Sequence, residues 1–173
     1  MNFVLTGFMA SGKTEISRCL AQALGYAWVD TDEQIEKKMQ MPIRDMFAQY
    51  GEQYFRDLET EIIREIAQSD RTVISTGGGV VLRRENIDLL RSTGVILNLA
   101  PDFSVITDRI RDAAATRPLM NGKSIDEIEK LFNERRVFYN NCDYQIRVNN
   151  EKTAAEHAEE ILNMLKGEGL LAQ

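Results

Sequence analysis

The fold of this chain is decided by residues 7–14, GFMASGKT, which match the pattern GxxxxGK[ST] of a phosphate-binding loop. An apolar segment, residues 2–6, leads into the first glycine, and Ile16, Leu20 and Leu24 follow the motif at helical spacing. The pattern carries chemical meaning only in this order of strand, loop and helix, and all three parts are present. The motif therefore predicts a loop that binds the phosphates of a nucleotide, ATP or GTP.

Each position of this motif has a physical role in holding phosphate. Glycines at both ends supply unusual backbone dihedrals, so that backbone N–H groups converge on an anion at a helix N-terminus. Lys13 would reach the outer phosphates, and the hydroxyl of Thr14 would be a ligand of the Mg²⁺ that bridges them. The alternative is a glycine turn that merely precedes a helix start, and the context favours the phosphate loop. The residues expected to contact nucleotide are Gly7, Ala10, Ser11, Gly12, Lys13, Thr14 and Ile16.

Strands and helices alternate along the rest of the chain. Apolar or β-branched segments, each followed by a turn and a helical pattern, lie at Asn2–Thr6, Tyr26–Asp30, Thr72–Thr76, Val95–Ala100 and Tyr144–Val148. This alternation is typical of α/β proteins with a parallel sheet. We therefore expect one domain, residues 1–173, with a five-stranded, doubly wound parallel sheet in a three-layer arrangement.

The composition limits the possible partners and chemistry. With 21 basic and 27 acidic residues the net charge is −6, which disfavours attraction to nucleic acid or to an anionic membrane. No apolar run approaches the ~18 residues that cross a bilayer, and we expect a cytoplasmic protein and a monomer. Cys19 and Cys142 form no CxxC pair, so neither a disulfide framework nor a zinc site is expected. The one histidine, His157, lies in a helical stretch that looks exposed, which argues against a histidine-centred triad.

Acidic residues follow the second predicted strand, in the segment VDTDE. Open α/β sheets bind ligands beyond the carboxyl ends of their strands, so Asp30 and Asp32 would face the phosphates. Asp30 could hold the metal through water, and Asp32 could take the proton of an attacking hydroxyl. A purely structural alternative stands beside this one, because acids are favoured in the first turn of any helix and Thr31 with Gln34 has the spacing of a capping box.

Three consecutive glycines, Gly77, Gly78 and Gly79, follow the third predicted strand. Glycines are entropically costly in an ordered chain, so this run implies that backbone approaches something closely or turns with positive φ. A ligand in the crevice would explain either feature. A tight strand-to-helix turn before Arg84 would explain them as well.

An acidic protein that binds anions needs cations placed at its site. Arg56 lies on a predicted helix three residues before Glu59, which could orient its guanidinium. Arg117 lies in an irregular segment, residues 112–123, which predicts a loop that closes over the phosphates, and Arg135 lies in NERRVFY. An isolated arginine on a helix is usually solvated, so the three gain weight only as a set.

These motifs together resemble the shikimate kinase family, in the nucleoside monophosphate kinase-like branch of P-loop proteins. The resemblance runs from Phe3 to about Val148 and rests on LTGFMxSGKT, a strand ending in VDTD, GExxFRxxE at residues 51–59, STGGGVV, RPLM and RxxFY. It implies ATP-dependent phosphorylation of the 3-hydroxyl of shikimate, with Mg²⁺, to give shikimate 3-phosphate in the biosynthesis of chorismate and the aromatic amino acids.

The motifs and the resemblance together imply roles for individual residues. The catalytic set would be Lys13, Asp32 and Arg117, and the metal ligands Thr14 and Asp30. The substrate would contact a helical segment at about residues 32–60 and the residues Asp32, Arg56, Gly77, Gly78, Gly79 and Arg135. Phe47 and Phe55 would wall its ring, Arg117 would be the lid arginine of residues 112–123, and Arg109, or in its place Arg111, would lie on the adenine.

The sequence departs from the family pattern at two places, and two other functions compete. Ala10 stands where the family often has glycine, and Phe138 where leucine is commoner. The first is a different small-molecule kinase, such as a gluconate or nucleoside monophosphate kinase, and the GExxFR and GGG segments together argue against it. A non-catalytic nucleotide-binding protein would have no need to retain the whole catalytic set, although a fold alone never fixes activity.

Overall fold

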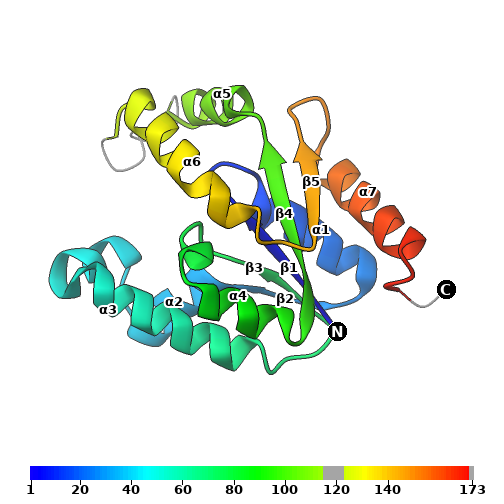
Figure 1. Cartoon of the computed structure of the whole chain (residues 1–173), viewed down its shortest axis with the longest axis horizontal. Helices are drawn as coiled ribbons and strands as arrows, with labels where there is room; N and C mark the ends of the chain where they lie inside the picture. The colour runs from blue at the N-terminus through cyan, green and yellow to red at the C-terminus, as the bar shows by residue number, and fades with distance from the viewer. Residues whose placement is uncertain (115–122, 172–173) are drawn as a thin grey trace.

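The strand and the helix that flank the phosphate loop lie at the centre of the fold in a computed structural model that describes residues 1–114 and 123–171. Strand β1, Asn2–Gly7, is buried along its whole length. Helix α1, Lys13–Leu24, begins where the loop ends and stops at Gly25, which adopts a left-handed conformation. The loop therefore leaves the sheet from an interior strand (Figure 1).

All five strands of the sheet pair in parallel, in the order β2-β3-β1-β4-β5. The strands besides β1 are β2, Ala27–Asp30; β3, Thr72–Ser75; β4, Gly94–Pro101; and β5, Tyr144–Val148. The predicted five-stranded parallel sheet is confirmed, and the predicted strand ends agree with the observed ones to within a residue. Parallel strands put their carboxyl ends at one edge, so the segments that follow β1, β2 and β3 meet there.

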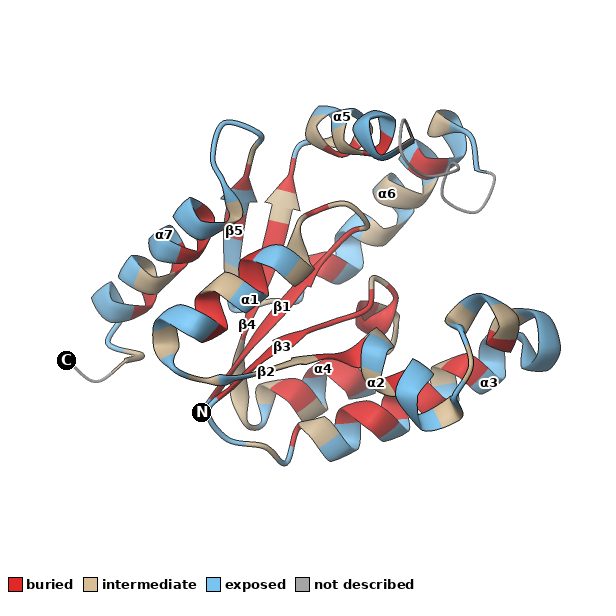
Figure 2. Ribbon diagram, turned by 180° about the vertical axis from the view of Figure 1, so that it is seen from behind, coloured by how far each residue is buried: buried red, intermediate tan, exposed pale blue. Residues whose placement is uncertain are grey.

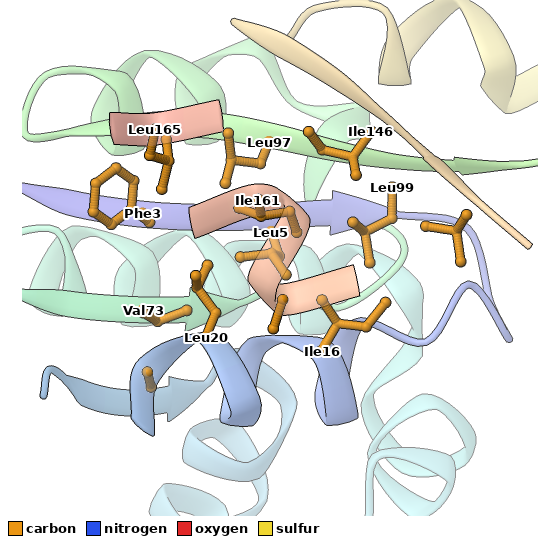
Figure 3. Packing of buried hydrophobic residues seen from close by; sticks show 13 residues of the cluster. Phe3, Leu5, Ile16, Leu20, Val73, Leu97, Leu99, Ile146, Ile161 and Leu165 are labelled. Atoms are coloured by element: carbon orange, nitrogen blue, oxygen red, sulfur yellow. The ribbon is translucent and has the colours of Figure 1, made fainter. Parts of the chain in front are cut away.

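Helices cover both faces of the sheet, as the doubly wound prediction requires. On one face α1 and α7, Ala154–Gly167, enclose a cluster that includes Phe3, Leu5 and Leu97 (Figure 3). On the other face the apolar cluster includes Val4 and side chains of four α-helices. These helices are α3, Ile43–Ile66; α4, Arg84–Arg91; α5, Phe103–Ala114; and α6, Ile125–Tyr139. Alternate residues of β1 thus enter opposite cores, as the period of a strand demands.

A smaller helical unit extends from the carboxyl end of β2. Helix α2, Thr31–Met39, packs against α3 around a third apolar cluster that contains Ile35, Met46 and Phe55. Gly51, with φ of 82°, kinks α3 in its interior. The kink separates a short first portion of α3 from the long portion that runs along the sheet. The short portion and α2 together form the projecting end of the molecule in Figure 1.

One prediction about burial is wrong. His157 is 2% exposed, whereas its helical stretch looked exposed in the sequence. It shares one face of α7 with Ile161 and Leu165, at intervals of four residues, and that face packs against α1 and the sheet. Figure 2 shows the buried and exposed faces of α7.

Cys19 and Cys142 are both free thiols. Among the described helices, none has the length and apolar character needed to cross a bilayer.

The left-handed end of α1 yields a prediction about stability. Gly25 has φ of 64°, so an added Cβ is disfavoured there even though the space around it is open. Gly25→Ala is expected to lower the free energy of unfolding by about 1 kcal/mol. Gly167→Ala is the matched control, because Gly167 lies in the last turn of α7, also in open space, and alanine there is expected to raise stability by about 0.5 kcal/mol. Urea unfolding measures both, and changes of the same sign would contradict the assignment.

Candidate active site

The phosphate loop is shaped by three residues with positive φ. Gly7 and Gly12 have φ of 153° and 91°, and a Cβ on Gly7 would lie 2.9 Å from the carbonyl oxygen of Leu99. Ala10 has φ of 58°, a left-handed conformation that costs a non-glycine residue about 1 kcal/mol. Ala10 thus keeps the backbone shape that glycine would adopt without strain. The loop geometry survives this departure from the family pattern.

Lys13 folds back over the loop. Its Nζ donates to the carbonyl oxygens of Gly7 and Phe8, at 2.7 and 2.9 Å. Removal from water lowers the pKa of Lys13 to about 8, against the opposing effects of the Asp32 and Asp30 carboxylates. The cation is therefore held at the mouth of the loop, beside two acids.

Asp30 ends β2 and caps α2. Its Oδ1 accepts hydrogen bonds from the backbone N–H groups of Asp32 and Glu33, at 3.0 and 3.3 Å. The capping box that the structural alternative placed at Thr31 and Gln34 is not the cap of this helix, because the N-cap is Asp30, one residue earlier. The Thr31 hydroxyl instead accepts a hydrogen bond from the backbone N–H of Gly77 at 2.8 Å, and so joins α2 to the glycine turn.

Oxygen donors suited to Mg²⁺ are present beside the loop. The Thr14 hydroxyl lies at the start of α1, and both cap hydrogen bonds of Asp30 use Oδ1, which leaves Oδ2 for water or metal. In residues 1–114 and 123–171 no group of three or more His, Cys, Asp or Glu forms a protein metal cage. Mg²⁺ beside a nucleotide needs no such cage, because phosphates and water supply most of its ligands. The residues therefore fit the ion.

The glycine turn receives three charged side chains. A Cβ on Gly77 would collide with the Asp32 carboxylate, and one on Gly79 would collide with the Arg56 guanidinium. A Cβ on Gly78 would lie 4.0 Å from Nη1 of Arg135 and 4.0 Å from the carbonyl oxygen of Gly7.

None of the three glycines is among the residues with positive φ, so of the two reasons predicted for them close approach holds, at Gly77 and Gly79. The groups that approach these two are an acid and a guanidinium, and the Arg135 guanidinium lies in ordinary contact range of Gly78, where the turn faces the phosphate loop. This arrangement is what an anionic, hydroxylated ligand requires.

Arg56 is held in place by a buried carboxylate. Its Nη1 donates to both oxygens of Glu59, at 3.0 and 2.9 Å, as the spacing of the two residues predicted. Burial raises the pKa of the Glu59 carboxyl, and the Arg56 guanidinium opposes that rise. Phe47 and Phe55 lie beside the pair with their rings tilted by 36° and the ring centroids 4.7 Å apart. They form an apolar wall next to the guanidinium, which lies 5.2 Å from the centroid of Phe55.

Asp32 is a carboxyl in a poorly solvated, acidic setting. Burial raises its pKa to about 6, helped by the nearby charges of Asp30 and Glu59 and opposed by Lys13. At neutral pH such a carboxyl is mostly ionised but takes a proton far more readily than an exposed aspartate. It therefore suits proton transfer.

Besides the Thr31 hydroxyl, two anchors of the site were not found from the sequence. Tyr139 donates its hydroxyl to the carbonyl oxygen of Gly78 at 2.6 Å, and Arg83 donates to the backbone carbonyl oxygen of Arg56 at 3.0 Å. Tyr139 ends the RxxFY motif, which was the one available signal. Arg83 follows the short helical turn Val80–Leu82 and gives no sequence signal of its own.

Arg109 lies across the loop. Its Nη1 donates to the carbonyl oxygen of Ala10 at 3.0 Å, whereas Arg111 is exposed. Ile16 is 2% exposed and packs in the core beneath the loop, so its side chain supports the loop from below. Arg117 and most of the predicted lid, residues 112–123, lie outside the described residues.

Comparisons with known proteins agree on one family. The family model described as shikimate kinase matches residues 9–166. A shikimate kinase of Caldicellulosiruptor bescii is 45% identical over 146 residues, 84% of each chain, and one of Aquifex aeolicus is 36% identical over 170 residues, 98% of this chain and 99% of its own. A solved shikimate kinase from Acinetobacter baumannii, in complex with shikimate, has a TM-score of 0.88 at 30% identity and covers 98% of this chain and 95% of its own.

The raised pKa of Asp32 predicts a pH-dependent cost in stability. Below pH 3.8 the carboxyl is protonated in both the folded and unfolded states, and above pH 6 the folded state must keep it ionised in a poorly solvated place. Asp32→Asn removes this penalty. The variant's free energy of unfolding relative to the parent is expected to rise by about 2 kcal/mol between pH 4 and pH 7.5. Denaturant titrations at both values test it, and a pH-independent difference would contradict the assignment.

Proposed function

The chain belongs to the shikimate kinase family, and on this premise we propose which of its residues carry the phosphoryl transfer from ATP to the 3-hydroxyl of shikimate. The observation that carries the proposal is the convergence of Asp32, Arg56 and Arg135 on the Gly77–Gly79 turn beside the phosphate loop. An acid next to two guanidiniums suits a small ligand that has both a hydroxyl and a carboxylate. The solved relative in complex with shikimate supports this choice of ligand.

Arg56 and Arg135 bind the carboxylate in this proposal. A guanidinium presents two parallel N–H donors to the two oxygens of a planar carboxylate, a geometry that lysine cannot reproduce. Glu59 fixes the orientation of Arg56 through two hydrogen bonds and leaves its Nη2 free of that pair. The Gly78 and Gly79 backbone lies against the same ligand, and Phe47 and Phe55 cover its ring.

Asp32 accepts a hydrogen bond from the 3-hydroxyl and takes its proton as the new O–P bond forms and the bond between the γ-phosphorus and the bridging oxygen of ADP breaks, which releases ADP. Its raised pKa brings proton affinity closer to neutral pH, which favours general base catalysis. Lys13, held 2.7 Å from the carbonyl oxygen of Gly7, lies where negative charge develops on the transferred group. The acid and the cation thus face each other across the reacting atoms.

ATP and Mg²⁺ occupy the loop side of the site in this proposal. The backbone of residues 7–14 cups the phosphates, and Thr14 with Asp30 would hold the metal, which neutralises phosphate charge when bound. Arg109 lies beside the nucleotide base. The role of Arg117 in covering the phosphates rests on the sequence alone.

A coupled assay for ADP release tests the proposed activity. Shikimate, gluconate and nucleoside monophosphates are offered in turn with Mg-ATP. Release with shikimate alone is the expected result. Release with gluconate or a nucleoside monophosphate would assign a different kinase, and binding of ATP without release for any acceptor would assign a non-catalytic nucleotide-binding protein.

Asp32→Asn separates chemistry from nucleotide binding. The amide cannot take the proton, so kcat is expected to fall by about 10²–10⁴. The Kd of ATP is expected to stay within about twofold, because the loop is untouched. Glu33→Gln, on the exposed side of the same helical turn, is the matched control and should leave kcat unchanged. A collapse of ATP binding in the Asp32 variant would remove Asp32 from its assigned role.

Arg56→Lys tests the carboxylate contact. Loss of the paired donors is expected to raise the KM of shikimate roughly tenfold and to leave the KM of ATP within about twofold. Arg64→Lys is the matched control, because Arg64 lies two turns later on α3 and pairs with Glu85 at the surface. Initial-rate kinetics with each substrate varied separately decide the outcome. An equal rise in both constants would move Arg56 out of the substrate site.

A further inference from the structure

The buried histidine of α7 contacts one peptide of the segment that follows β5. Nε2 of His157 lies 3.3 Å from the carbonyl oxygen of Asn149 and 3.5 Å from its backbone nitrogen. In one tautomer the ring donates to the carbonyl, and in the other it accepts from the N–H. In both tautomers the side chain fixes the same residue, Asn149.

Asn149 lies at the start of a tight turn. Its Oδ1 accepts hydrogen bonds from the backbone N–H groups of Glu151 and Lys152, at 3.1 and 3.2 Å. The turn ends at Thr153, whose hydroxyl accepts from the N–H of Glu156 and caps α7. His157 is therefore one helical turn inside the helix whose beginning it helps to fix against the sheet.

The same turn holds Arg109 by two of its three hydrogen-bonding nitrogens. Nη2 donates to the carbonyl oxygen of Asn149 at 3.1 Å, and Nε donates to Oδ1 of Asn150 at 2.9 Å. The remaining nitrogen, Nη1, donates to Ala10 in the phosphate loop and lies 3.1 Å from the position of a Cβ on Gly12. The guanidinium thus bridges the turn and the loop, with every nitrogen on a separate acceptor.

From this chain of contacts we propose that His157 is a positioning residue for the nucleotide half of the site. It holds the peptide of Asn149 so that the carbonyl oxygen meets Nη2 of Arg109, and Arg109 in turn lies across the phosphate loop. The path from His157 through Asn149 and Arg109 to Ala10 is unbroken, with each contact at 3.3 Å or less. The inference rests on the proposed place of Arg109 beside the nucleotide.

A role in packing alone does not account for this histidine. The residues around it on α7, Ala158 and Ile161, are buried and apolar, and a leucine would fill the position without bringing a polar ring into the core. Nδ1 is buried, has no hydrogen-bond partner among the described residues, and lies 3.6 Å from Oε2 of Glu160. Burial of this polar ring is therefore unfavourable in itself, and the contact with Asn149 gives a reason for a histidine at this position.

Two substitutions separate positioning from packing. His157→Leu keeps the apolar volume and loses the contact with Asn149, and it is expected to raise the KM of ATP about three- to tenfold, the factor that loss of one hydrogen bond gives. The KM of shikimate should stay within about twofold, because no contact of the path touches the glycine turn. His157→Gln places an amide near the position of Nε2 and is expected to restore most of the affinity for ATP.

A control variant excludes general loosening of the helix. Leu162→Ala removes apolar packing elsewhere on α7, because Leu162 is partly buried against the same core and its side chain cannot hydrogen-bond Asn149. It is expected to lower the melting temperature and to leave the KM of ATP unchanged. A rise in the KM of ATP in Leu162→Ala equal to that of His157→Leu would overturn the inference, as would a His157→Gln variant no better than leucine.

A double-mutant cycle with Arg109→Ala tests whether His157 acts through the arginine. Arg109→Ala alone should raise the KM of ATP, and in that background His157→Leu should add no further rise, since the contact through which it acts in this proposal is gone. An unchanged KM of ATP in Arg109→Ala would reject the proposed place of Arg109. A raised KM in Arg109→Ala with an unaffected His157→Leu, or with fully additive effects, would reject only the role of His157.

Discussion

The proposed substrate half of the site depends on the absence of side chains at Gly77 and Gly79. The carboxylate of Asp32 and the guanidinium of Arg56 occupy the space that a Cβ at these positions would need. Close approach of this kind fixes a turn only if its own backbone is held, and two hydrogen bonds do so: Thr31 accepts from the N–H of Gly77, and Tyr139 donates to the carbonyl of Gly78. Backbone and side chains therefore position each other, which is how a preorganised anion site resists relaxation.

The charges at this turn are costly to keep without ligands. Burial raises the pKa values of Asp32 and Glu59 and lowers that of Lys13, so the charged form of each group is less stable in the fold than in water. Arg56 offsets part of this for Glu59, and Lys13 does so for Asp32. Neither cation fully offsets the effect of burial on the pKa of its neighbouring carboxyl. The unliganded site would therefore gain stability from an anion beside Lys13 and a cation beside the acids, which substrate and metal would supply. Sites of this type trade stability for binding and catalysis.

The sequence was sufficient for the sheet and the phosphate loop because both depend on short-range patterns. The pairing of Arg56 with Glu59 was predicted for the same reason, because residues three apart lie on the same face of a helix. The anchors of the glycine turn could not be found this way, because Thr31 and Tyr139 come from 46 and 61 residues away in the chain. The burial of His157 was predicted wrongly because the residues next to it in the sequence are mostly polar. Its burial depends on the packing of α7 against α1, which local sequence does not reveal. The placing of Arg117 still rests on its motif.

The distance between the two halves of the site is set by the pairing of β1 with β3. Leu5 pairs with Ser75, and beyond that pair Thr76 donates both its N–H and its hydroxyl to the carbonyl oxygen of Leu5, each at 3.1 Å. The loop leaves β1 at Gly7, two residues after Leu5, and the glycine turn begins at Gly77, two residues after β3 ends at Ser75. A slip of the register would therefore move the phosphates and the acceptor hydroxyl relative to each other by about 3.3 Å per residue, more than in-line transfer tolerates. Buried parallel strands with apolar side chains on both faces resist such a slip, so the core that stabilises the fold also fixes the reaction geometry.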